Sequence, residues 1–186
     1  MKFNLLNALN TYQPIDDNDK NNLENLISFL NTNNNCFDRK DFDGHITAGA
    51  LIMDNNSNVL INHHKDINSW LLFGGHSDGN CDSLAVAKRE VEEESGITEY
   101  ECNGRILDID IHIVPENTQK NEPAHKHYDI RFLFFVNNNY YKLSNESIEA
   151  KWVTIDEAKV LMKDADKIRL LDKAYQEYLK YKKHIL

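Results

Sequence analysis

The sequence predicts a mixed α/β or α+β domain built around a mixed β-sheet. Two observations support this class: apolar residues recur at helical spacing in some segments, and β-branched, strand-like runs occupy the segments between them. The 186 residues, of which 41% are hydrophobic, suit one globular unit with a single core. We expect residues 1–40 to form a helical extension packed on a domain over residues 41–186, which ends in further helices.

The first expected elements are a helix and a strand hairpin. Residues 16–19 offer several N-cap side chains, and leucine and isoleucine recur at helical spacing over residues 23–30. We therefore expect a helix over residues 17–31, which an asparagine-rich run ends. Two apolar, β-branched segments then flank a polar turn and predict strands over residues 46–53 and 59–61.

A short strand, a polar loop and a helix are expected in the middle of the chain. Residues 70–73 form an apolar strand that leads into Gly74 and Gly75, and a polar loop follows them. Residues 83–95 then show helical periodicity. Gly96 is expected to end this helix, because glycine adopts a left-handed backbone conformation at little cost.

The second half of the chain adds three strands and two helices. One segment alternates apolar and polar residues as a half-buried strand does, and an aromatic and β-branched run after it predicts a central strand. In chain order, the expected segments are a strand over 105–114, a loop over 115–127, strands over 128–136 and 150–153, a helix over 155–162 behind the capping residue Thr154, and a helix over 165–182.

Four glutamates crowd the end of the middle helix, between Glu90 and Glu94. Carboxylates one helical turn apart repel each other by about 0.2–0.5 kcal/mol unless a positive charge lies among them. Helical geometry places Glu90, Glu93 and Glu94 on one arc, while apolar side chains occupy another arc that can face a core. The alternative is a solvated charged helix. Such a helix normally has lysine partners, which this segment lacks, so a divalent cation explains the crowding better.

The segment from Gly75 to Ile97 resembles the signature of the Nudix hydrolase family. That signature is Gly, five residues, Glu, seven residues, and then Arg-Glu-aliphatic-x-Glu-Glu-x-Gly-aliphatic. Gly75 and the run Arg89–Ile97 fall on this spacing. One position departs from it, because Cys81 stands where the first Glu is expected. Asp82 and Asp78 lie nearby and are candidates to replace the missing carboxylate.

The resemblance implies a fold and an activity. The fold would be an α/β/α sandwich around a mixed sheet. The activity would be metal-dependent hydrolysis, with water attacking phosphorus in the diphosphate linkage of a nucleoside diphosphate derivative, either a nucleotide sugar or a nucleoside triphosphate. The cofactor would be Mg²⁺ or Mn²⁺, which prefer oxygen ligands. Specificity would come from loops outside the signature, and their composition does not name a base or sugar.

Roles follow for the residues of the signature. Glu90 and Glu94, one turn apart, are the first choice as metal ligands. Glu93 is either a third ligand or the base that takes a proton from water, and both remain open. Arg89 is assigned to orienting a glutamate of the cluster, since its guanidinium can hold a carboxylate in two places.

Further residues are candidates for binding the substrate. Glycines would let backbone amides approach the phosphates, and histidines close to them or at the end of the long loop could face the site. The candidates are Gly74, Gly75, His76, His125, His127 and Arg131. A histidine in such places is more often a surface or hydrogen-bonding residue. For Trp70 and Tyr128, packing in the core or at its rim is favoured over stacking on a base.

Composition narrows the remaining possibilities. A net charge of −9 argues against general nucleic-acid binding, which depends on clustered Lys and Arg. Three widely spaced cysteines indicate neither a disulfide framework nor a zinc site, and they fit a reducing cytoplasm. No apolar run is long enough for a membrane span. The expected partner is a small nucleoside diphosphate-type substrate, and a homodimer is compatible with the sequence.

Two other functions remain as alternatives. A non-catalytic nucleotide-binding or regulatory module on the same fold would explain the lost first Glu, although such proteins usually lose the ligand glutamates as well. An isopentenyl-diphosphate isomerase-like enzyme would need a cysteine and a glutamate paired in the pocket, and the sequence does not place such a pair.

Overall fold

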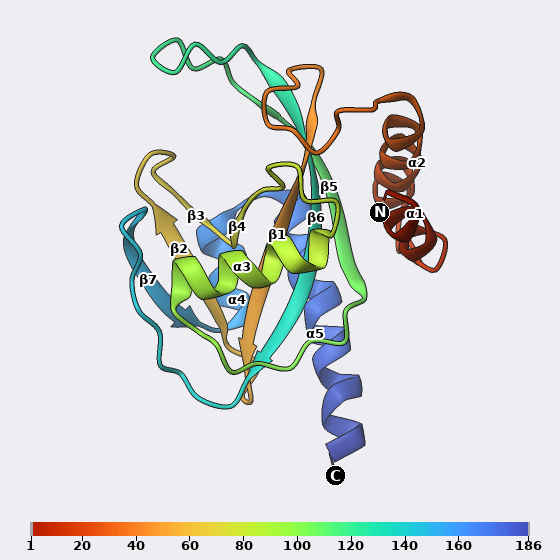
Figure 1. Ribbon diagram of the computed structural model, residues 1–186. Coiled ribbons are helices and arrows are strands. Elements are labelled where there is room, and N and C mark those ends of the chain that lie inside the picture. The colour runs from red at the N-terminus through yellow and green to blue at the C-terminus, as the bar shows by residue number, and fades with distance from the viewer. Residues whose placement is uncertain (1, 186) are drawn as a thin grey trace.

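The computed structural model describes residues 2–185, with side chains through residue 183, and it shows a sheet between layers of helices (Figure 1). The helices are α1 Lys2–Leu9, α2 Asp17–Thr32, α3 Ser83–Ser95, α4 Ile155–Met162 and α5 Ala165–Ile185. The strands are β1 His45–Asp54, β2 Val59–His64, β3 Ser69–Leu71, β4 Phe73–His76, β5 Ile106–Val114, β6 His125–Val136 and β7 Ser147–Val153.

The sheet is mixed, as the sequence predicts. Its central path runs in the order β3-β2-β1-β6-β5, while β4 pairs with β1 and β7 pairs with β2. β1 and β6 are parallel along their whole shared length, from His45 opposite His127 to Asp54 opposite Val136. The other pairings are antiparallel. This long parallel pair places the first residues of β1 and β6 side by side at one end of the sheet.

Helices cover both faces of the sheet. In Figure 1, α3 lies in front of the sheet, and α4 and α5 lie behind it. Side chains from α3 and from α1 and α2 share one apolar core with the front of the sheet, and α4 and α5 close a second core at its back. The α/β/α arrangement is therefore confirmed. None of the described helices combines the length and the apolar character that crossing a bilayer requires.

Most elements agree with the sequence prediction, and local signals explain the agreement. α3 covers the expected residues, and Gly96 ends it with a φ of 67°. α4 begins behind Thr154, whose side chain forms a capping box with Glu157. α2 extends one residue beyond the expected end at residue 31.

α1 falls within the helical extension expected over residues 1–40, although the sequence marks no separate helix over residues 2–9. Two expectations about the elements were wrong. The apolar run 70–73 is divided between β3 and β4, and Gly74 and Gly75 lie within β4 rather than after a strand. β6 begins at His125, so His125 and His127 belong to this strand and not to a loop, because pairing with β1 extends it.

A buried ionic network joins α2 and α5 to the back of the sheet. Asp108 in β5 has no exposed surface and accepts hydrogen bonds from Arg131, Arg169 and Lys173. Lys173 in α5 also donates to Asp19 in α2, over 2.6 Å. The carboxylate of Asp108 thus balances cations from β6 and α5. The carboxylate of Asp19 connects α2 to Lys173.

Replacing the central carboxylate tests how much this network contributes to stability. We expect Asp108→Asn to lower the free energy of unfolding by about 3–5 kcal/mol, because it leaves Arg131, Arg169 and Lys173 buried without their shared partner. Asp172→Asn is the matched control, because Asp172 is paired with a lysine at the surface and should cost less than about 1 kcal/mol. Urea unfolding measures both, and equal stability of the two variants would contradict the prediction.

Candidate active site

The candidate active site lies where α3 packs against the glycine strand β4. The backbone N–H of Gly74 donates to Glu94 Oε2 over 2.9 Å. A Cβ at position 75 would lie 2.5 Å from Glu90 Oε1, closer than nonbonded atoms approach. The carboxylate of Glu90 therefore occupies the space that a side chain at position 75 would need, while Glu94 is held by the backbone of position 74. The Gly74 amide is used by Glu94, which corrects the expectation that it is free for a phosphate.

Helix α3 holds these carboxylates in place through its apolar face. Ala87 and Val91 are fully buried in the core under the helix. On the side toward β4, Glu90 is only 8% exposed and Glu94 only 7%. Buried carboxylates are costly unless they are paired, hydrogen-bonded or bound to a cation. The helix therefore places two acidic groups where a cation would offset the cost of burying them.

Arg89 contacts both the strand and the carboxylate cluster. Its Nη2 donates to the backbone carbonyl of His76 over 2.8 Å and to Glu90 Oε1. Its Nε lies 3.7 Å from Glu93 Oε2. Arg89 thus orients Glu90 against the end of β4, which is the kind of contact that the sequence predicts for it.

Glu93 lies apart from the buried pair. Its side chain is 65% exposed and faces the guanidinium of Arg89. Among the residues that the structure describes, Glu90, Glu93 and Glu94 do not bring one oxygen each within 4.8 Å of one another. The structure therefore brings Glu90 and Glu94 together against β4 and leaves Glu93 at the edge of the site, facing solvent.

The electrostatics of the site favour a bound cation. Burial, together with the negative charges of Glu90 and Glu146, raises the pKa of Glu94 to about 8, and the hydrogen bond from the Gly74 amide opposes this rise. Burial also raises the pKa of Glu90. A divalent cation would oppose both shifts, because it stabilises the ionised carboxylates.

Glu146 is a site residue that the sequence does not reveal. It lies just before β7, and its charge acts on both Glu90 and Glu94. Its side chain is exposed and lies 3.8 Å from His64 Nε2. No local pattern in the sequence separates Glu146 from the other residues of the loop before β7. Only the pairing of β7 with β2 brings it near α3.

The missing first glutamate is not replaced by either nearby aspartate, which corrects that expectation. Asp82 caps α3 and accepts from the Ala85 amide over 3.0 Å. Asp78 forms two hydrogen bonds with Arg39. The Cys81 thiol packs against the core and forms one weak hydrogen bond, 3.8 Å from the Gly79 carbonyl oxygen. Arg89 instead obtains its partners from Glu90 and the backbone.

The three candidate histidines do not lie among the glutamates. His76 ends β4 and stands directly opposite Thr47 of β1, so it points to the other face of the sheet from Gly75. Burial lowers the pKa of His76 to about 4. His125 and His127 lie on that same face, where the ring of His127 stands 5.1 Å from that of His76.

Arg131 does not reach a substrate, which corrects its place among the candidates. It is only 4% exposed. Its guanidinium forms hydrogen bonds with Asp108, Asp110 and Asp129. These carboxylates hold its positive charge inside the network behind the sheet, so its role is structural.

The two aromatic candidates pack within the protein. Tyr128 is buried and stacks on Phe29, with ring centroids 3.9 Å apart. Trp70 stacks on His63, and Lys151 Nζ lies 4.4 Å from the centroid of its ring. These contacts agree with the packing roles that the sequence favours for both residues.

Comparison with known proteins agrees with the family resemblance of the sequence. A family model described as NUDIX domain matches residues 43–174. A Lactococcus lactis subsp. cremoris protein named probable DHNTP pyrophosphohydrolase is 32% identical over 93 residues, 49% of this chain and 54% of that protein. The chain thus spans about half the length of this curated relative.

Solved structures share the fold. The Caenorhabditis elegans Ap4A hydrolase in a binary complex aligns with a TM-score of 0.60 and 21% identity, over 73% of this chain and 97% of that one. The Escherichia coli dihydroneopterin triphosphate pyrophosphohydrolase aligns with a TM-score of 0.57 and 15% identity, over 69% and 92% of the two chains. At these identities the similarity concerns the fold alone.

The two glycines of β4 should respond differently to a methyl group. In Gly75→Ala the new Cβ meets only the flexible carboxylate of Glu90, so we expect folding to survive and Mn²⁺ affinity to fall about tenfold or more. In Gly74→Ala the Cβ would lie 2.7 Å from the Ala48 carbonyl oxygen, which is backbone, so we expect a loss of about 1–3 kcal/mol in stability.

Urea unfolding and Mn²⁺ titration followed by electron paramagnetic resonance measure the two effects. Gly79→Ala is the control for a substitution in the neighbouring loop, because no atom lies within 4 Å of its Cβ position, although its φ of 84° adds backbone strain. Unchanged Mn²⁺ affinity in Gly75→Ala would show that the position of Glu90 does not matter for the metal.

Proposed function

We propose, from the premise that this chain belongs to the NUDIX domain family, that it is a metal-dependent hydrolase of phosphoanhydride bonds in nucleoside diphosphate derivatives. The observation that carries this proposal is the pair of buried carboxylates, Glu90 and Glu94, packed against the glycine strand. A purely structural helix has no need for two buried acids at this place. A cation-binding helix requires them.

The residues present fit Mg²⁺ or Mn²⁺. Glu90 and Glu94 would hold the ion through oxygen ligands. The negative charges of Glu93 and Glu146 lie close enough to raise the pKa of both carboxylates. When bound, the ion would neutralise phosphate charge and make a water a better nucleophile at neutral pH. Waters and substrate phosphates would complete its ligand shell, as is usual for Mg²⁺.

The other residues act by orientation and proton transfer. Arg89 donates hydrogen bonds to Glu90 Oε1 and to the His76 carbonyl at the end of β4, and it thereby holds the Glu90 carboxylate in place. The Gly74 amide fixes one oxygen of Glu94. Glu93 is exposed at the edge of the cluster, 3.7 Å from Arg89 Nε, and this solvent-facing position supports a role in taking a proton from the attacking water. We assign this role to Glu93, with a third metal ligand as its alternative.

The substrate class follows from the same site. A diphosphate brings the negative charge that a cation on α3 would hold, while the net charge of −9 gives no general attraction for nucleic acid. The names of the similar proteins refer to DHNTP and Ap4A, compounds that contain phosphoanhydride bonds. We therefore place nucleoside triphosphates first among the substrates to be tested, with nucleotide sugars second.

Changing single glutamates of α3 tests the assignment of roles. We expect Glu94→Gln and Glu93→Gln each to lower turnover by about 100-fold or more, because a ligand or a base is lost. Glu92→Gln is the matched control on the same helix. Glu92 contacts Tyr100 rather than β4, so its loss should leave turnover close to that of the unmodified protein. The measurement is phosphate or nucleoside monophosphate release across a nucleotide panel with Mg²⁺ and with Mn²⁺.

Two outcomes of this panel would reject the proposal. If Glu93→Gln and Glu94→Gln both keep full activity, the glutamates are not the catalytic groups. If the unmodified protein is silent on every substrate but still binds nucleotides, the non-catalytic module becomes the better account.

The cysteine that replaces the first glutamate should be dispensable. We expect Cys81→Ala to keep turnover within about threefold, because the thiol makes only a weak hydrogen bond, which contributes little. Cys81→Glu should preserve or raise turnover, since it restores the carboxylate of the family signature. A sharp loss of turnover in Cys81→Ala would mean that the thiol has a role of its own.

A further inference from the structure

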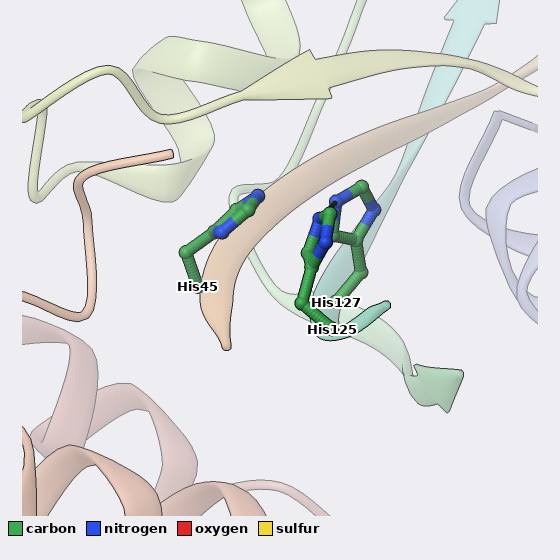
Figure 2. Close-up of side chains that lie close together, drawn as sticks. All are labelled: His45, His125 and His127. Atoms are coloured by element: carbon green, nitrogen blue, oxygen red, sulfur yellow. Dashed lines mark hydrogen bonds between the residues drawn. The ribbon is translucent and has the colours of Figure 1, made fainter. Parts of the chain in front are cut away.

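Three histidines converge where β1 and β6 begin, and no step of the proposed hydrolysis uses them. Figure 2 shows His45 of β1 and His125 and His127 of β6 with their rings turned toward a common region. One ring nitrogen of each lies within 4.8 Å of one ring nitrogen of the others. We call these residues the histidine cluster. Strand alternation places it on the face of the sheet opposite α3, because His45 and Thr47 share a face and Ala48 faces the front core.

The hydrogen bonds of the cluster fix which ring nitrogens carry protons. His45 Nδ1 lies 3.1 Å from the Asp41 carbonyl, and His125 Nδ1 lies 2.7 Å from the Pro123 carbonyl. A carbonyl only accepts, so both Nδ1 atoms are protonated, and in the neutral ring Nε2 is then the atom that carries the lone pair. Histidine ligands of metals commonly donate their other ring N–H to a backbone carbonyl in this way.

The Nε2 atom of His45 has no protein partner. The residue is 1% exposed, and this nitrogen is buried without any hydrogen bond. Buried polar atoms are nearly always satisfied, so a buried lone pair without a partner requires an explanation. A hydrogen bond between His127 and His125 could give those two rings a partner, but it would leave His45 Nε2 without one.

The spacing between His125 and His127 matches a tetrahedral metal, and a ring nitrogen of His45 lies within 4.8 Å of theirs. His125 Nε2 and His127 Nε2 lie 3.3 Å apart. Two nitrogens bound to Zn²⁺ at about 2.0–2.1 Å with tetrahedral angles stand about 3.3–3.4 Å apart. The same pair of atoms could share a hydrogen bond at this distance. Only a shared ion also gives a partner to His45 Nε2.

We propose that His45, His125 and His127 form a binding site for a transition-metal ion of the Zn²⁺ type, separate from the glutamate site on α3. Imidazole nitrogen suits Zn²⁺, Co²⁺ and Ni²⁺, whereas Mg²⁺ and Mn²⁺ prefer the oxygen ligands of the glutamates. Three protein ligands leave one tetrahedral position for water or for an oxygen of a bound molecule. The ion joins β1 to β6 and, through the two carbonyls, holds the loops at Asp41 and Pro123.

Co²⁺ titration of the full chain tests the proposal, because tetrahedral Co²⁺ absorbs visible light far more strongly than octahedral Co²⁺. The expected result is an intense visible band that saturates at one Co²⁺ per chain and is displaced by Zn²⁺. His125→Ala and His127→Ala should lose this band. His63→Ala is the matched control, since His63 bonds Asn68 outside the cluster, and it should keep the band.

A second variant distinguishes Co²⁺ binding at the histidine cluster from Co²⁺ binding at the glutamate site. Glu94→Gln should retain the intense band, because it removes an oxygen ligand on the other face of the sheet. Loss of the band in Glu94→Gln, together with its retention in both cluster variants, would overturn the proposal.

A measurement without substitutions covers the case in which the cluster variants do not fold. Long-range ¹H–¹⁵N spectra of the unmodified protein report each imidazole nitrogen. Zn²⁺ should shift the Nε2 resonances of His45, His125 and His127 and leave those of His63 in place. Nε2 resonances that do not move at saturating Zn²⁺ would overturn the proposal.

Discussion

The close contact between α3 and the glycine strand β4 is the constraint on which the site depends. A helix that carries buried carboxylates can approach a strand this closely only where the strand has no side chains. Gly75 leaves room for the carboxylate of Glu90, and Gly74 gives Glu94 a hydrogen bond through its amide. The pairing of β4 with β1 fixes the strand, and the apolar side chains under α3 fix the helix. The acidic pair is therefore positioned by the core of the domain and not by a flexible loop.

The two faces of the sheet carry different polar chemistry. The front face meets the carboxylates of α3, whose oxygens suit hard cations. The back face carries imidazoles at the start of β1 and β6, and further along β6 Arg131 pairs with Asp108 of the neighbouring strand β5. Because side chains of a strand alternate between faces, neighbouring residues such as Gly75 and His76 serve opposite sides. This alternation places the two chemically distinct clusters on opposite faces of the sheet.

The parts of the structure that follow from local sequence signals could be predicted. The extent of α3, its end at Gly96 and the cap at Thr154 depend on residues within one or two helical turns. The family signature likewise lies within one continuous segment, so Glu90 and Glu94 could be placed on one side of a helix. These features need no knowledge of what the rest of the chain does.

Features that depend on distant pairing could not be predicted. The start of β6 at His125 follows from its parallel register with β1, some eighty residues earlier. The same register brings His45 to the other two histidines, and the pairing of β5 with β6 buries Arg131 among the carboxylates. Glu146 approaches α3 only because β7 pairs with β2. In each case the residue type was visible in the sequence, but its neighbours were set by the topology of the sheet.

The central claim is that α3 and β4 together build a site for a divalent cation, and paramagnetic Mn²⁺ tests it most directly. In ¹H–¹⁵N spectra of the unmodified protein, the account predicts that substoichiometric Mn²⁺ first broadens the backbone signals of Gly74, Gly75 and Glu94. Signals from α1 should persist at the same concentration. Broadening that begins elsewhere and leaves these three residues sharp would contradict the account.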